Sequence, residues 1–196
     1  MKPTLSRWRP EIRNVWSLDP VYSFVNFSVL HRGLSRICGR FDEVDGSLEA
    51  SEGAGEGAGD EVSLVLTLGS GSINTGHLLR DSDLRSDLFL DASRYPTITF
   101  TGTRLVPNGN AHGRLEGRLS LHGIERPLAM KALLHGGTDA AGCDRLGLRA
   151  QARVDRRLFG IGWTPTLPPN CAGLGRHVAV CIEAQFVRAE GVYRVA

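Results

Sequence analysis

The sequence lacks the marks of a membrane-spanning, exported or metal-binding protein. No apolar run approaches the roughly 20 residues that a membrane-spanning helix needs, so we expect no stable membrane insertion. The N-terminal residues include no apolar core of an export signal. The four cysteines form neither a C-x-x-C pair nor a zinc-ligand spacing. These absences predict a cytoplasmic protein with reduced thiols.

Lysine is nearly absent as well. Only Lys2 and Lys131 accompany 21 arginines, and the formal net charge is +2. Guanidinium groups suit phosphate and carboxylate ligands, but a GC-rich genome that encodes Arg in place of Lys explains the excess more simply. Because the net charge is so small, we expect no nucleic-acid partner.

Catalytic motifs are also missing. The sequence contains no G-x-S-x-G, no H-E-x-x-H and no P-loop. Its six histidines have no metal-ligand spacing, so we expect neither a metal nor a cofactor. His31 ends an inward-facing strand pattern, where a structural histidine is more common than a catalytic one. We therefore do not expect an enzyme.

What the sequence does have is alternation of apolar and polar residues with a period of two, the pattern of half-buried strands. Between residues 114 and 121, Leu115, Leu119 and Leu121 share one face and polar residues the other. Similar stretches recur along the chain, and His122-Gly123 forms the clearest hairpin turn between two of them. About eight such strands predict an all-β fold, an antiparallel barrel.

Two segments interrupt this pattern. Residues 50–61 are a low-complexity Gly/Ala/Glu stretch, which predicts a mobile loop. Residues 75–92 predict a short helical segment in which Asp81 and Arg85, four positions apart, could form an ion pair. We interpret residues 1–196 as one domain, with 1–13 as an N-terminal extension.

A barrel of this size either fills its interior with side chains or encloses one small ligand. Because the alternation is the same in both cases, the pattern predicts a soluble antiparallel barrel and leaves the state of its lumen open.

Four sequence blocks resemble a known family. Residues 16–41 begin W-S-L-D-P-V-Y-S-F, and residues 72–100 contain I-N-T-G, R-D-S-D-L-R-S and R-Y-P-T-I-T-F. They are followed by G-R-L-S-L-H-G-I-E-R-P-L (117–128) and R-R-L-F-G-I-G-W (156–163). Together these blocks span almost the whole chain. They are similar to the YceI-like family, the polyisoprenoid-binding, lipocalin-like proteins of bacteria.

The resemblance implies an extended eight-stranded lipocalin-like barrel with a helical segment over one end. It also implies that the lumen takes a long isoprenoid chain, as in polyprenyl phosphates or quinones, and that a homodimer can form. Family members are often exported, so the missing signal suggests a cytoplasmic branch. Asp83 stands where the family commonly has His, and residues 50–61 are an insertion. We therefore expect the head-group end to differ.

The leading hypothesis is a carrier or sequestering protein for an isoprenoid lipid. The rivals are an enzyme that uses His31 with a nearby carboxylate in the lumen, and a packed, stress-related barrel without ligand. We expect Arg80 and Arg85 at the polar head of the lipid. The other expected ligand contacts are the tunnel residues Val25, Phe27, Val29, Ile98, Phe100, Leu119, Leu121, Leu148 and Ile182, the closing residues Phe159, Ile161 and Trp163, and His31, Leu84 and Phe89.

Overall fold

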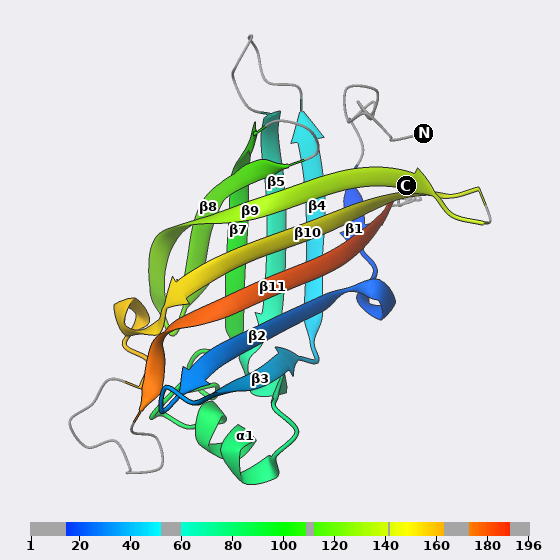
Figure 1. Cartoon of the computed structure of the whole chain (residues 1–196). Helices are drawn as coiled ribbons and strands as arrows, with labels where there is room; N and C mark the ends of the chain where they lie inside the picture. The colour runs from blue at the N-terminus through cyan, green and yellow to red at the C-terminus, as the bar shows by residue number, and fades with distance from the viewer. Residues whose placement is uncertain (1–14, 52–59, 109–111, 141, 163–172, 189–196) are drawn as a thin grey trace.

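The fold is seen in a computed structural model that describes residues 15–51, 60–108, 112–140, 142–162 and 173–188. Within these residues the strands form one antiparallel sheet, and α1 (Leu78–Arg85) lies at its lower end in Figure 1. The strands are β1 (Trp16–Leu18), β2 (Phe24–His31), β3 (Ser35–Phe41), β4 (Val44–Ser51), β5 (Asp60–Gly69), β6 (Ile73–Asn74), β7 (Thr97–Pro107), β8 (Gly113–Leu121), β9 (Ile124–Thr138), β10 (Asp144–Asp155) and β11 (Leu174–Arg188).

The sheet closes into a barrel through β11. One edge of β11 pairs with β10, and the other edge pairs with β2 over residues 174–183 and with β1 over residues 186–188. Since β1 also pairs with β4, the order β1-β4-β5-β7-β8-β9-β10-β11 forms a ring. Figure 1 shows the strands in front crossing those behind obliquely. The predicted eight-stranded antiparallel barrel is confirmed.

Three of the eight barrel strands are bent, which is why the sheet is divided into eleven strands. β1 pairs with β4, and β2 pairs with β3. On their other edges, β4 pairs with β5 and β3 pairs with β6. Each of β1–β2, β3–β4 and β5–β6 is therefore one barrel strand with a bend. Ser72 holds two bends together, because its hydroxyl donates to the Gly69 carbonyl at 2.7 Å and accepts from the Glu43 amide at 3.0 Å.

The predicted hairpin at His122-Gly123 is confirmed. Both residues have positive φ, 53° and 71°, as a two-residue type I′ turn between β8 and β9 requires. The His122 ring packs edge-on against Tyr95, and its Nδ1 lies 3.0 Å from the Phe159 carbonyl oxygen. His122 therefore joins this turn to the segment before β11.

The helical segment is shorter than the predicted range 75–92, because α1 ends at Arg85 and turns follow. The predicted ion pair between Asp81 and Arg85 is wrong. The buried Asp81 carboxylate accepts hydrogen bonds from the amide and hydroxyl of Thr75. Arg85 donates to the carbonyls of Gly71 and Ile73 at 2.7 and 2.8 Å. Both side chains are thus committed to the turn before α1 and fasten the helix to it.

The predicted loop 50–61 is too long at both ends. Ala50 and Ser51 end β4 and pair with residues of β5, which begins at Asp60. The rest of this loop and the expected extension 1–13 lie outside the described residues. None of the described helices has the length and apolar character to span a membrane.

Candidate functional site

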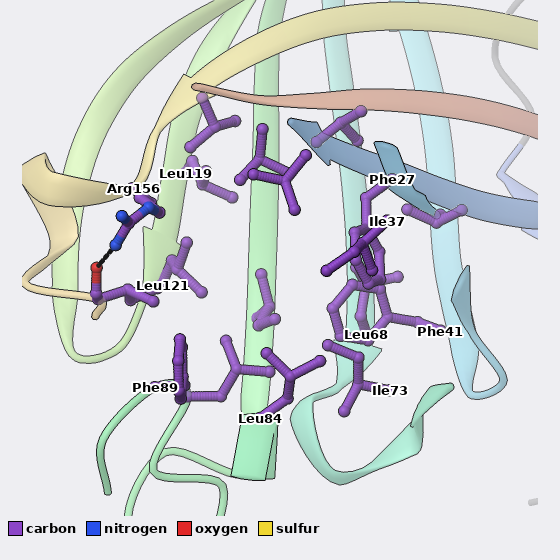
Figure 2. A pocket seen from close by; sticks show the side chains of 18 of the residues that line it. Phe27, Ile37, Phe41, Leu68, Ile73, Leu84, Phe89, Leu119, Leu121 and Arg156 are labelled. Carbon is purple, nitrogen blue, oxygen red and sulfur yellow. Dashed lines mark hydrogen bonds between the residues drawn. The ribbon is translucent and has the colours of Figure 1, made fainter. Parts of the chain in front are cut away.

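The inward side chains of the barrel are packed in one half and surround a cavity in the other. Away from α1, side chains such as Phe186, Leu64 and Leu146 are at most 2% exposed and fill the lumen. Toward α1, the inward side chains surround a cavity of about 510 Å³, which Figure 2 shows from close by. Small-molecule sites in proteins typically enclose roughly 300–1,000 Å³. The cavity is therefore large enough for a small ligand.

Glycines help to keep this half open. Gly39 lies opposite Phe27 across β2 and β3, and a Cβ on Gly39 would clash with the Phe27 ring. On β8, a Cβ on Gly117 would lie 2.7 Å from the Phe100 ring. Because these positions carry no side chain, both rings can rest against a neighbouring strand rather than fill the lumen.

The segment containing α1 covers the lower end of the cavity. Leu84 and Phe89 point into the cavity from below, and Ile73 of β6 lies at the same end (Figure 2). Arg80 also lines this end, and its guanidinium donates from Nε to the Thr75 hydroxyl at 2.7 Å and from Nη2 to the Thr75 carbonyl at 3.0 Å. Thr75 thus holds Arg80 and Asp81 together at the start of the helix.

Arg156 is a buried cation in the wall of the cavity. It begins the short 3₁₀ helix Arg156–Phe159, and its guanidinium donates to the carbonyls of Ile161, Gly162, Leu174 and Gly175 at 2.7–3.1 Å. Figure 2 shows one of these hydrogen bonds as a dashed line from Arg156. Burial, reinforced by the positive charge of Arg157, lowers the pKa of Arg156. An arginine stays protonated even so, and four carbonyl dipoles solvate its charge.

Our sequence reasoning missed Arg156, although the block R-R-L-F-G-I-G-W contains a signal for it. A Cβ on Gly162 would lie 2.8 Å from Arg156 Nη1, so glycine is needed where the guanidinium crosses the backbone. A glycine with positive φ shortly after an arginine is consistent with such a close approach.

The cavity lining is apolar with few exceptions. Its polar members are His31, His77, Arg80, Asp83 and Arg156. No Ser, Thr, Cys, Lys or Tyr side chain is found among the described lining residues. No group of three or more potential metal ligands occurs in the part of the chain that the structure describes. This environment suits the burial of an apolar chain.

Most of the site residues expected from the sequence line this one cavity. Three do not. Leu148 lies in the packed half of the barrel, and Phe159 is buried behind the wall. Arg85 is turned to the backbone of Gly71 and Ile73. Trp163 lies outside the described residues. The expected residues that line the cavity are Val25, Phe27, Val29, His31, Arg80, Leu84, Phe89, Ile98, Phe100, Leu119, Leu121, Ile161 and Ile182.

Other lining residues were not among those expected. Several belong to the apolar stripes that the alternation indicates, and the missing information was their depth along the barrel. The residues on or near α1 are not marked by any such alternation in the sequence. The complete set of lining residues that we did not expect is Ile37, Phe41, Leu66, Leu68, Ile73, His77, Leu79, Asp83, Leu90, Leu128, Met130, Val154, Arg156, Leu174, Val178 and Val180.

Comparison with known proteins agrees with this architecture. The chain is 36% identical over 141 residues to a UPF0312 protein of Vibrio cholerae. The alignment covers 71% of this chain and 72% of that protein. Among solved structures, BcnA of Burkholderia cenocepacia superposes with a TM-score of 0.69 at 16% identity, over 86% of this chain and 98% of that chain.

A polyisoprenoid binding domain from Saccharophagus degradans has the same fold. It superposes with a TM-score of 0.65 at 15% identity, over 90% of this chain and all of the domain. The model of the YceI-like domain matches residues 16–186 and so includes all the barrel strands except the last two residues of β11. The chain therefore belongs to the YceI-like family.

Proposed function

We propose that this protein binds one long apolar chain of the isoprenoid type in the barrel lumen, and carries or sequesters it without changing it chemically. The observation that supports this most is the cavity of about 510 Å³, whose described lining is apolar apart from five residues. Membership of the YceI-like family and the similar fold of a domain described as polyisoprenoid binding also support the proposal.

Burial alone supplies enough free energy for binding. Moving a methylene group from water into an apolar site contributes about 0.8 kcal/mol, before the cost of ordering the chain. A chain of several isoprene units therefore needs no specific polar contact. Branched, unsaturated chains also lose less conformational freedom on binding than saturated ones do, which suits a cavity with fixed walls.

We place the polar head of the ligand at the α1 end, near Arg80 and His77. Arg80 lies at the cavity with its guanidinium oriented by Thr75, and guanidinium donors match phosphate or quinone oxygens. Arg85, which we expected to share this role, is bound to two carbonyls instead. The ligand is thus proposed to be a polyprenyl phosphate or a quinone, with its polar head at this end of the cavity.

The rival enzymatic function would need a reactive group in the lumen. The polar residues of the described lining are two histidines, one aspartate and two arginines. The proposal needs no cofactor. Location in the cytoplasm and assembly into a homodimer stay predictions from the sequence, which cell fractionation and sedimentation would test.

The experiment that tests the proposal is mass spectrometry of an organic extract of the purified protein. We expect a near-stoichiometric prenyl lipid, whose mass would also identify the head group. Phe100→Arg should abolish it, because Phe100 is 4% exposed beside the cavity and an unpaired charge there is costly to bury. The matched control is Thr99→Arg, since alternate residues of a strand face opposite sides.

A second variant covers the case in which Phe100→Arg fails to fold. Leu121→Trp should fill part of the cavity with apolar bulk and lower the lipid content while the protein stays folded. A wild-type extract free of prenyl lipid, together with no binding of added prenol, would refute the proposal.

A further inference from the structure

The end of the barrel where α1 lies carries leucine side chains that are exposed to solvent. Leu34, in the turn between β2 and β3, is 89% exposed, and Leu78 and Leu79 of α1 are 87% and 75% exposed. Leu79 also lines the cavity, so the cavity reaches the surface beside Leu79. Figure 1 shows α1 and the β2–β3 hairpin at the same end of the barrel.

The hairpin that carries Leu34 is also basic. Between Phe24 and Phe41 the sequence has Arg32, Arg36 and Arg40 but no Asp or Glu. Arg40 forms an ion pair with Asp42. Arg32 and Arg36 flank the turn that holds Leu34, and Arg36 also donates to the Ser28 hydroxyl at 3.3 Å. The α1 segment adds acidic residues of its own, so the positive charge is concentrated on the hairpin.

We propose that this end, comprising the 31–36 turn and the first turn of α1, docks on the surface of an anionic lipid bilayer. Exposed leucines beside basic side chains match the two layers of such a surface, since the leucines can enter the acyl boundary while the arginines meet lipid phosphates. The inference rests on the proposed function in one respect. An apolar ligand can pass between the cavity and a bilayer without exposure to water only if the cavity mouth contacts the bilayer directly.

The test is flotation of the full-length protein with vesicles of mixed phosphatidylglycerol and phosphatidylcholine. We expect binding that weakens on vesicles of phosphatidylcholine alone and falls as salt rises, because screening weakens attraction between surface charges. Leu34→Asp combined with Leu78→Asp should reduce the bound fraction by roughly tenfold, because it removes apolar contacts and adds charge. Both positions are so exposed that the fold should tolerate the change.

The matched control is Val21→Asp. Val21 is 70% exposed in the 3₁₀ helix Pro20–Tyr22, at the other end of β2 from the turn, and its variant should bind vesicles as the wild type does. Arg36→Gln should weaken binding to the mixed vesicles alone. The docking proposal is overturned if the wild type does not float with mixed vesicles, if the double variant floats equally well, or if Leu34 and Leu78 prove to hold two copies of the chain together.

Lipid extraction separates this proposal from the proposed function. A double variant that keeps its prenyl lipid but no longer floats supports docking as a step distinct from cargo binding. A wild-type protein that floats through Leu34 and Leu78 yet contains and binds no prenyl lipid would refute the carrier function and leave docking intact.

Discussion

At the scale of single residues, Arg156 joins the wall of the cavity to the backbone around it. Its guanidinium donates hydrogen bonds to four carbonyls, which belong to residues 161–162 and 174–175. A methionine at this position would have a similar length but no donors, so several buried carbonyls would lose their partners. The wall on this side of the cavity therefore depends on one side chain.

We expect Arg156→Met to lower the free energy of unfolding by roughly 3 kcal/mol or more, since each buried carbonyl left without a donor costs about 1–3 kcal/mol. Arg156→Lys should cost less, because an ammonium group can still serve some of the carbonyls. Urea unfolding measures both. The control is Arg153→Met on the exposed face of β10, where we expect little change. Equal losses for the two Met variants would contradict the role of Arg156.

At the scale of elements, the position of α1 depends on the Asp81 carboxylate. Burial by itself raises the pKa of Asp81, but hydrogen bonds from Thr75, with the positive charge of Arg85 nearby, outweigh it and hold the pKa below the usual 3.8. A carboxyl group whose pKa is lowered on folding stabilises the folded state above its unfolded pKa. That stabilisation is lost as the pH falls through the lower, folded pKa.

Asp81→Asn should therefore be less stable than the wild type at pH 7, and the difference should shrink as the pH falls below 3.8. Thermal unfolding of both proteins across this pH range measures the effect. Asp87→Asn, at an exposed position after α1, provides the comparison and should differ little in stability from the wild type. A difference between Asp81→Asn and wild type that stays constant down to acidic pH would show that the lost stability does not come from the charge of Asp81.

At the scale of the whole molecule, the barrel divides into a packed half and a hollow half, and strands such as β5 cross both. On β5, Leu64 is 1% exposed among packed side chains, whereas Leu68 faces the cavity. The two leucines point to the same side of the strand, four residues apart. They therefore provide the same chemical change in two environments.

We expect Leu64→Ala to lower the free energy of unfolding by about 2–5 kcal/mol, the range for a leucine removed from a packed core. Leu68→Ala should cost only about 1–2 kcal/mol, because part of its surface already borders empty space. The measurement is urea unfolding of delipidated protein, since a bound ligand would stabilise the folded state on its own. Equal losses would mean that the cavity half is packed in solution.

The sequence by itself determined the barrel. Alternation along strands such as β8 fixes which side chains face inward, because a shift of one residue would expose the whole apolar set. The turn at His122-Gly123 is likewise local, since both residues must adopt positive φ. The helical segment was also predictable, apart from its end at Arg85. These features depend on neighbours in sequence and can be predicted from it.

Tertiary structure alone decided where the barrel is hollow and what its polar side chains do. Leu148 and Phe100 have the same pattern in sequence, yet one packs against the filled half and the other borders the cavity. Depth along the barrel depends on strand bends and on side chains from other strands, which no local pattern contains. Similarly, Arg85 and Asp81 have ideal helical spacing, but carbonyls and hydroxyls from the preceding turn provide closer partners for both. An ion pair of the exposed Arg85 would gain little free energy, so the hydrogen bonds to these nearby groups prevail over it.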